Sequence, residues 1–236
     1  MRFHALASSS HGNAYIIDDG ATRILIECGI SFRRLNQLAG FQLADVSACF
    51  ISHEHKDHAK CYRELLKNGM EVYASAGTAD ALDCEQITVI EERETVVIGT
   101  LEVMPFRVFH DAAEPFGFLV RSREDMDKLA FATDTVNLQY RFPGVTILAI
   151  ECNYARPILE RCTRMPEKVR RRIENSHMEV ERLCSWLADL PLHDCREIYL
   201  LHLSDACADE QQFAYRVRRS VSPHIKVIPC PKVLEV

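Results

Sequence analysis

The chain has 236 residues, of which 47% are hydrophobic and 26% charged, and a formal net charge of −6 at pH 7. This size and composition are typical of a globular protein with a sizeable core, and we predict a single domain over residues 1–236. No apolar run approaches the ~20 residues of a membrane helix, so no membrane partner is expected. The acidic charge argues against broad nonspecific nucleic-acid binding, but it allows a local basic patch.

The N-terminal residues lack the apolar core of a signal peptide, so we expect a cytoplasmic protein, in a cell or in an infected host. Ten cysteines are scattered along the chain without a Cys-x-x-Cys pair. In a chain without an export signal, buried reduced thiols are expected instead of disulfides. A structural zinc site made of cysteines is the minor alternative.

Short strands are predicted over residues 2–7, 14–18 and 23–28, from their apolar patterns. A Ser/Gly-rich turn that contains Ser10 and Asn13 separates the first two strands. This turn is either a plain hairpin connection or a loop that contacts a substrate.

A dense group of metal-binding side chains follows an apolar run over residues 46–51, which predicts a buried strand. Three imidazoles and one carboxylate occur within six residues, and they suit a divalent transition metal. These residues are His53, His55, Asp57 and His58. A helix predicted over 59–68 comes next, so the group lies on a strand-to-helix loop, where functional residues concentrate. A solvated polar loop or a helix cap is the alternative.

Further along, predicted strands and helices alternate. Helices are predicted over 31–39, 76–83, 178–190 and 211–219, and strands over 70–74, 95–98, 101–109, 116–121, 128–132, 145–152, 196–201 and 224–229. Three more metal-binding side chains lie where such strands end: His110, Asp134 and His202. Each of them alone would be an ordinary loop residue, but their order after the dense group favours a metal site.

Residues 154–176 are the most basic segment of this acidic chain, with seven arginines or lysines and three glutamates. A solvated helical face is one interpretation, and a clamp for phosphate groups is the other. The segment leads directly into His177, which is followed by a predicted amphipathic helix. The candidate substrate contacts are Ser10, Asn13, Arg164, Lys168 and Arg171.

The pattern His-x-His-x-Asp-His at 53–58, with the three later residues in order, resembles the signature of the metallo-β-lactamase superfamily. The loop Ser-Ser-His-Gly-Asn-Ala at 9–14 resembles an element of its YycJ/WalJ-like branch. The pair His177 and His202 resembles the late histidines of RNase Z and YycJ/WalJ-like phosphodiesterases. The resemblance covers nearly the whole chain. It implies an α/β (α+β) fold, the αββα sandwich of two mixed β-sheets flanked by helices.

The resemblance also implies a dinuclear site with two divalent metals, zinc in the nitrogen-rich position and zinc or manganese in the other. By this likeness, His53, His55 and His110 hold one metal, Asp57, His58 and His202 hold the other, and Asp134 bridges them. A shared hydroxide would be the nucleophile. The candidate catalytic residues are Asp57 and His177, the latter contacting the scissile phosphate or protonating the leaving oxygen. Glu27 stands where the family usually has Asp, as a partner of a ligand or as a cap.

These residues predict a metal-dependent phosphodiesterase that acts on nucleic acid or on a nucleotide. A hydrolase of a small ester, thioester or lactone is the alternative enzyme. A metal-stabilised protein that binds nucleotides without turnover is the non-enzymatic alternative. His55 argues against flavin-linked diiron members of the superfamily, which have Glu there, and the chain leaves no room for a β-CASP insertion.

Overall fold

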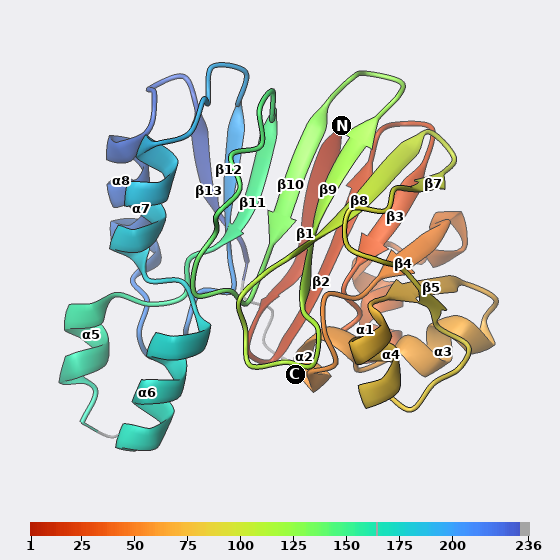
Figure 1. Ribbon diagram of the computed structural model, residues 1–236, viewed down its shortest axis with the longest axis horizontal. Coiled ribbons are helices and arrows are strands. Elements are labelled where there is room, and N and C mark those ends of the chain that lie inside the picture. The colour runs from red at the N-terminus through yellow and green to blue at the C-terminus, as the bar shows by residue number, and fades with distance from the viewer. Residues whose placement is uncertain (164, 232–236) are drawn as a thin grey trace. The chain divides into compact units, whose positions relative to one another are not determined.

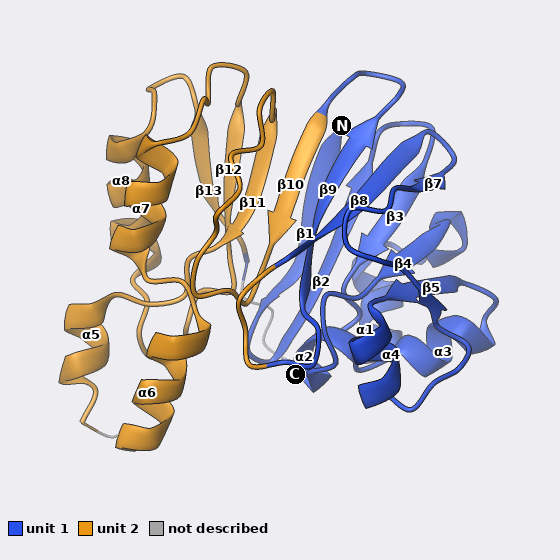
Figure 2. Ribbon diagram, in the orientation of Figure 1, with its two compact units in different colours: residues 1–107, 112–127, 231–236 blue, residues 108–111, 128–230 orange. Residues whose placement is uncertain are grey.

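The computed structural model describes residues 1–163 and 165–231 (Figure 1). Arg164, one of the candidate substrate contacts, lies outside these residues. The chain divides into two compact units, which Figure 2 shows in different colours. Unit 1 holds residues 1–107, 112–127 and 231, and unit 2 holds residues 108–111 and 128–230. The single-domain organisation stays a prediction. Among the helices described, none has the length and apolar character that a membrane span requires.

Unit 1 contains a six-stranded sheet with the strand order β1-β2-β3-β4-β5-β6. Its strands are β1 (Arg2–Ser9), β2 (Gly12–Asp18), β3 (Arg23–Ile26), β4 (Ala48–Phe50), β5 (Glu71–Ala74) and β6 (Thr88–Val89). The first three strands are antiparallel neighbours, and β3 to β6 pair in parallel. Parallel strands end at the same edge of a sheet, so the loops that follow β3 and β4 lie together there.

Helices pack their apolar residues on this sheet and form one buried core. They are α1 (Phe32–Leu38), the 3₁₀ segment η1 (Leu43–Asp45), α2 (Lys56–Ala59), α3 (Tyr62–Lys67) and α4 (Ala76–Ala81). Leu35 of α1, Leu65 of α3 and Ala79 of α4 belong to the same hydrophobic cluster as Leu25 and Val72 of the strands. Burial of such side chains is the main term that stabilises these short helices, which would not form alone.

The second sheet contributes antiparallel strands to unit 1 and parallel strands to unit 2. In unit 1, β7 (Val96–Ile98), β8 (Leu101–Arg107) and β9 (Phe116–Ser122) pair in antiparallel order. In unit 2, β10 (Lys128–Ala132), β11 (Ile147–Glu151), β12 (Glu197–Leu201) and β13 (Lys226–Pro229) pair in parallel. Strand β11 is buried at every position. Its first four residues are apolar, as expected for a strand of a parallel sheet that is covered on both faces.

The described part of unit 2 also contains helices, which follow β11 and β12 along the chain (Figure 1). They are α5 (Arg156–Arg161), α6 (Glu167–Ser176), α7 (Val180–Ala188) and α8 (Glu210–Ser220). Helices α7 and α8 bury Leu183, Phe213 and Val217. Helices α5 and α6 lie over a small separate cluster that contains Tyr154 and Leu159.

Every strand predicted from the sequence is present, with shifted ends, but one predicted helix is wrong. The apolar pattern predicts a continuous helix over 59–68, whereas the structure has two short helices, α2 and α3. The break comes at Cys61, whose backbone N–H donates to the carbonyl of Cys28, 3.0 Å away. A tertiary hydrogen bond therefore replaces the helical one. All ten cysteines are free thiols, as predicted.

Asp19, in the turn between β2 and β3, joins the two sheets inside unit 1. Its carboxylate accepts hydrogen bonds from the hydroxyls of Thr100 and Ser122, at 2.7 and 2.9 Å, and from the backbone N–H of Thr22 at 2.8 Å. Burial raises the pKa of Asp19, but the hydrogen bonds from Thr100, Thr22 and Ser122 outweigh it and leave that pKa below the usual value. The ionised form is therefore favoured by folding.

We expect Asp19→Asn to lower the free energy of unfolding at pH 7 and to matter much less below pH 4. A carboxyl group with a depressed pKa stabilises the folded state above the unfolded pKa of about 3.9, and this contribution is lost as the pH falls through the folded pKa. Urea unfolding at pH 7, 5, 4 and 3 measures the difference in the free energy of unfolding between the unmodified protein and the variant. A difference that stays constant over this range would contradict a stabilising role of the ionised Asp19 carboxylate.

Candidate functional site

Three polar residues near the ends of parallel strands share an unusual backbone conformation. Glu27 follows β3, Asp134 lies just beyond β10, and His202 follows β12; their φ angles are 64°, 42° and 51°. For a residue other than glycine such a conformation costs about 1–3 kcal/mol; it persists where surrounding structure enforces it and clusters at functional sites. All three side chains are buried. The carboxyl ends of these strands are therefore the place to look for a site.

In unit 1, the loop after β4 gathers the histidine cluster, which we define as His53, His55, Asp57 and His58. His53 and His55 lie in the loop itself, and Asp57 and His58 lie in α2. The ring centroids of His53 and His58 are 4.1 Å apart. Imidazole Nε2 of His58 lies 3.4 Å from Asp57 Oδ2. The structure thus brings together the four residues that the sequence singled out in this loop.

The nitrogen atoms of this cluster converge as metal ligands do. Nε2 of His53 and Nδ1 of His55 are 3.0 Å apart, close to the ~3.3 Å between two nitrogens around a tetrahedral zinc ion. The other ring nitrogen of His53, Nδ1, contacts the hydroxyl of Ser52 at 2.8 Å. A partner on the second nitrogen is what orients a metal-binding imidazole. The spacing of these two nitrogens is therefore compatible with a zinc-type ion bound by His53 and His55.

Glu27, just beyond the end of β3, contacts both the histidine cluster and the loop that carries it. The carboxylate is fully buried; Oε1 lies 3.6 Å from Nδ1 of His58, and Oε2 accepts from the backbone N–H of Ser52 at 3.3 Å. Burial raises the pKa of Glu27, and the nearby His58 opposes this rise. Glu27 thus reaches both a candidate ligand and the backbone of the metal loop, as the sequence allowed.

Asn13, near the start of β2, contacts the same loop. Its side-chain amide donates to the carbonyls of Ser9 and Asp57, both at 3.1 Å, and lies 3.2 Å from Nε2 of His58. Asn13 is completely buried, so these contacts give it a positioning role. Ser10 is exposed in the turn. A substrate contact by either residue stays a prediction.

In unit 2, the ends of three neighbouring parallel strands gather the carboxylate–histidine cluster, which we define as Asp134, Glu151, His177 and His202. One ligand atom of each lies within 4.8 Å of those of the others. Strands β10, β11 and β12 are adjacent, and they bring Asp134, Glu151 and His202 to one edge. His177 arrives from the end of α6. Of these four, Asp134 and His202 were predicted as metal ligands, and carboxylate and imidazole are suitable donors for a divalent metal.

Glu151 organises this cluster, and sequence reasoning missed it. Its Oε1 accepts from Nδ1 of His177 at 2.7 Å and lies 3.2 Å from Nδ1 of His202. Its Oε2 accepts from the backbone N–H groups of Thr135 and Met178, at 2.8 and 3.0 Å. With both oxygens engaged, Glu151 acts as a positioning residue more readily than as a ligand. Its place at the end of an apolar strand, before Cys152, was the signal that could have found it.

His177 forms a buried ion pair with Glu151. Burial would lower the pKa of His177, but the carboxylate of Glu151 raises that pKa above its usual value. Burial correspondingly raises the pKa of Glu151, while the His177 and His202 side chains bring it below its usual value. The His177 side chain is 13% exposed, whereas Glu151 is not exposed at all. His177 can therefore hold a proton at the accessible margin of the cluster.

His110 and His202 are arranged to bind through one nitrogen each. Nδ1 of His110 donates to the carbonyl of Ser176 at 2.9 Å, which leaves Nε2, 3.4 Å from Asp134 Oδ2, as its ligand atom. Burial lowers the pKa of His110 and favours the neutral ring that a metal requires. His202 is fixed by Asn153, whose amide donates to its carbonyl at 2.8 Å. Asn153 is a second residue that the sequence did not single out.

The predicted ligands thus occur as two groups, four residues in unit 1 and three in unit 2. Within each unit the structure brings them together. The assignment of individual ligands to two metals stays a prediction. Of the basic candidates, Lys168 and Arg171 lie exposed on α6.

A family profile described as "Beta-lactamase superfamily domain" matches residues 22–203. The chain belongs to this superfamily. The recognition made from the His-x-His-x-Asp-His pattern is therefore confirmed. The matched region contains every predicted metal ligand.

Relatives of this superfamily member agree with the predicted branch. The exodeoxyribonuclease YycJ of Bacillus anthracis is 31% identical over 221 residues, which cover 86% of this chain and 83% of that protein. The exodeoxyribonuclease WalJ of Streptococcus pneumoniae is 28% identical over 223 residues, with 86% and 82% coverage. The crystal structure of Zn²⁺-bound PqqB from Methylobacterium extorquens matches all of both chains with a TM-score of 0.75 at 15% identity. These comparisons confirm the fold of two mixed β-sheets flanked by helices.

Gly29 gives a test of how closely the histidine cluster is packed on β3. A Cβ atom at Gly29 would lie 1.6 Å from the carbonyl oxygen of Asp57 and 2.7 Å from the backbone nitrogen of His58. We expect Gly29→Ala to lower the free energy of unfolding by about 1–3 kcal/mol or more, as overpacking does, and to reduce metal content. Urea unfolding and elemental analysis measure the two effects.

Gly40→Asn is the matched control. Gly40 has a φ of 64° and nothing within 4 Å of its added Cβ, and Asn tolerates that conformation. We expect it to change stability little. A Gly29→Ala protein as stable and as rich in metal as this control would show that the close approach is not required.

Proposed function

We propose that this protein is a metal-dependent phosphodiesterase that hydrolyses DNA, with the histidine cluster and the carboxylate–histidine cluster together serving a dinuclear centre. The contact of His177 with Glu151, beside Asp134 and His202, is the observation that carries the proposal. Similarity to proteins named exodeoxyribonuclease over most of the chain supports it.

In this proposal, the seven predicted ligands hold two divalent ions. His53, His55 and His110 serve one ion and Asp57, His58 and His202 the other, with Asp134 shared. Zinc suits the imidazoles, and manganese is the alternative where carboxylates contribute. When bound, such ions act as Lewis acids, activate water and stabilise charge on a transferring phosphoryl group. Glu27, Ser52 and Asn153 keep the ligand side chains oriented.

His177 is the proposed general acid. Glu151 accepts a hydrogen bond from its Nδ1, so the ring is held in one orientation and can present a proton on Nε2 to the leaving oxygen. An alkoxide that leaves from DNA is a poor leaving group, so this proton matters for the natural reaction. Asp57, also predicted to be catalytic, contributes as a ligand.

Helix α6 is the proposed contact for the DNA backbone. It is joined to the loop of His110 in two places, through the carbonyl of Ser176 and through Arg172, which donates to Asp111 at 2.7 Å. Lys168 and Arg171 extend along the same helix into solvent. Arg171 forms an exposed ion pair with Glu167 at 2.5 Å, which is worth little and can be exchanged for a phosphate.

The small-substrate alternative, an ester, thioester or lactone hydrolase, has less support. It gives no role to the His177–Glu151 pair or to the basic helix. A nucleotide-binding protein without turnover would not need an oriented, partly accessible imidazole beside the ligands.

His177→Ala separates these alternatives. We expect about two metal ions per chain to remain, activity on DNA to fall by roughly 10²–10⁴-fold, and activity on bis(p-nitrophenyl) phosphate to fall much less, because nitrophenolate leaves without protonation. Steady-state kinetics on both substrates and elemental analysis make the comparison. Equal loss on both substrates, or loss of metal, would remove His177 as the general acid. A metal content at or below one after reconstitution of the unmodified protein would contradict the dinuclear centre.

The double variant Lys168→Glu and Arg171→Glu tests the basic helix. We expect the variant to bind single-stranded DNA more weakly and to cleave bis(p-nitrophenyl) phosphate as before. The slope of the logarithm of the binding constant against the logarithm of salt concentration should fall in magnitude by about 0.7 for each phosphate that the helix no longer neutralises. Fluorescence anisotropy at several salt concentrations measures binding. Arg219→Glu with Lys226→Glu, two exposed basic residues elsewhere in unit 2, is the control. Equal weakening by both double variants would assign the effect to net charge.

A further inference from the structure

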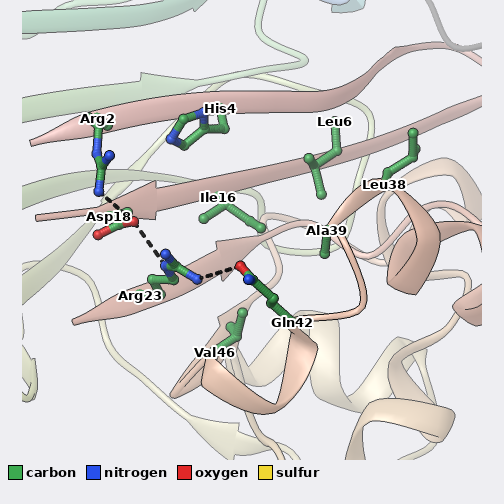
Figure 3. A pocket seen from close by; sticks show the side chains of 10 residues that line it. All are labelled: Arg2, His4, Leu6, Ile16, Asp18, Arg23, Leu38, Ala39, Gln42 and Val46. Carbon is green, nitrogen blue, oxygen red and sulfur yellow. Dashed lines mark hydrogen bonds and ion pairs between the residues drawn. The ribbon is translucent and has the colours of Figure 1, made fainter. Parts of the chain in front are cut away.

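Unit 1 contains a pocket of about 300 Å³ that the proposed reaction does not use (Figure 3). Strands β1, β2 and β3, the end of α1 and the segment around η1 form it. Its lining residues are Arg2, His4, Leu6, Ile16, Asp18, Arg23, Leu38, Ala39, Gln42 and Val46. Arg23 begins β3, whereas Glu27 follows the same strand at its other end. The pocket and the histidine cluster are therefore at opposite ends of β3.

One side of the pocket is a continuous chain of polar side chains (Figure 3). Arg2, Asp18 and Arg23 are direct neighbours across the three strands, so their side chains project from the same face. Asp18 Oδ2 accepts from Arg2 at 3.1 Å and from Nε of Arg23 at 2.9 Å. Arg23 also donates from Nη1 to the side-chain oxygen of Gln42 at 3.1 Å. Both guanidinium groups are thus held in place before any ligand arrives.

The polar side of the pocket holds two arginines beside one buried and one exposed aspartate. Burial raises the pKa of Asp18, but the hydrogen bond from the backbone of Gly20 and the charge of Arg23 bring that pKa below its usual value. One carboxylate therefore faces two arginines, and His4 lies beside Arg2. Asp45, 64% exposed and 3.9 Å from Arg23, is the other nearby acid. A guanidinium fork in such a setting can bind carboxylate or phosphate through paired hydrogen bonds.

The opposite side of the pocket is apolar. Leu6, Ile16 and Val46 come from the strands and their ends, and Leu38 and Ala39 come from the end of α1. Ile16 and Val46 belong to the buried core, whereas Leu6, Leu38 and Ala39 are only partly buried. A cavity with a largely apolar wall and a few placed polar groups is the usual form of a small-molecule site.

A purely structural role for the ion pairs explains only part of this arrangement. Cross-strand ion pairs stabilise a sheet modestly, and Asp18 with Arg23 already supplies such a pair. Arg2 adds a second cation to the same oxygen while 63% of its side chain stays exposed. A structural role of the ion pairs also does not explain why the partly buried Leu6, Leu38 and Ala39 line the same pocket as the two arginines.

We propose that this pocket binds a small organic anion, with a carboxylate or phosphate headgroup on Arg2 and Arg23 and a short apolar body along Leu6, Leu38 and Ala39. The proposal does not depend on the phosphodiesterase activity. Hexyl phosphate and hexanoate are suitable probes because they carry the same apolar body on the two headgroups. Inorganic phosphate supplies the anionic headgroup alone, and hexanol supplies the apolar body without an anionic headgroup.

Isothermal titration calorimetry on the full chain tests the proposal, with DNA cleavage measured in parallel. We expect hexyl phosphate or hexanoate to bind saturably at millimolar concentration or below, and inorganic phosphate and hexanol to bind at least about tenfold more weakly, since each lacks one half of the interactions. Arg2→Gln should weaken binding by about tenfold, as removal of a charged hydrogen bond does. Ala39→Phe should abolish it by filling the pocket. Cleavage by Arg2→Gln should be unchanged.

Arg33→Gln, an exposed arginine on α1 outside the pocket, is the matched control and should bind as the unmodified protein does. Arg2 is exposed, so its variant is expected to fold even if Ala39→Phe does not. Three results would each overturn the proposal: no saturable binding of either probe, equal binding of hexanol and hexyl phosphate, or equal binding by Arg2→Gln and Arg33→Gln.

Discussion

Buried carboxylates that fix imidazole rings are the interactions on which the candidate site depends. Glu151 holds His177 and lies against His202, while Glu27 lies against His58. Burying a charged group is costly unless it is paired and hydrogen-bonded, and both glutamates also accept backbone N–H groups. At Glu151 the same contacts leave Nε2 of His177 and of His202 for a proton or a metal.

This arrangement strains the backbone at a few positions. Glu27, Asp134 and His202 adopt positive φ angles just beyond parallel strands, and all three side chains are buried. Gly29 lets the loop of Asp57 approach the segment after β3 more closely than any side chain would allow. Strain and close approach of this kind are maintained by the packed strands on either side, most of whose side chains are buried.

The sequence by itself determined the family and most strands, with the helices at 31–39, 76–83, 178–190 and 211–219, and it singled out the candidate metal ligands. Strand β10 was predicted with its exact bounds and the other predicted strands with shifted ends, because apolar runs between turn residues indicate where a strand lies better than where it ends. His53 to His58 are recognisable because four ligand-type residues in six positions have no common structural explanation. His110, Asp134 and His202 became recognisable only through their order after that group.

Only the tertiary structure decided which residues support the site and where the chain departs from local preference. Glu151 and Asn153 lie 26 and 49 residues from their partners His177 and His202, and nothing in the local sequence pairs them. The helix predicted over 59–68 is broken because Cys28, distant in sequence, accepts a hydrogen bond from Cys61. The pocket of Arg2, Asp18 and Arg23 likewise exists only through strand register. Periodicity reports which face of an element is buried, whereas partners across the fold are chosen by contacts that local pattern does not encode.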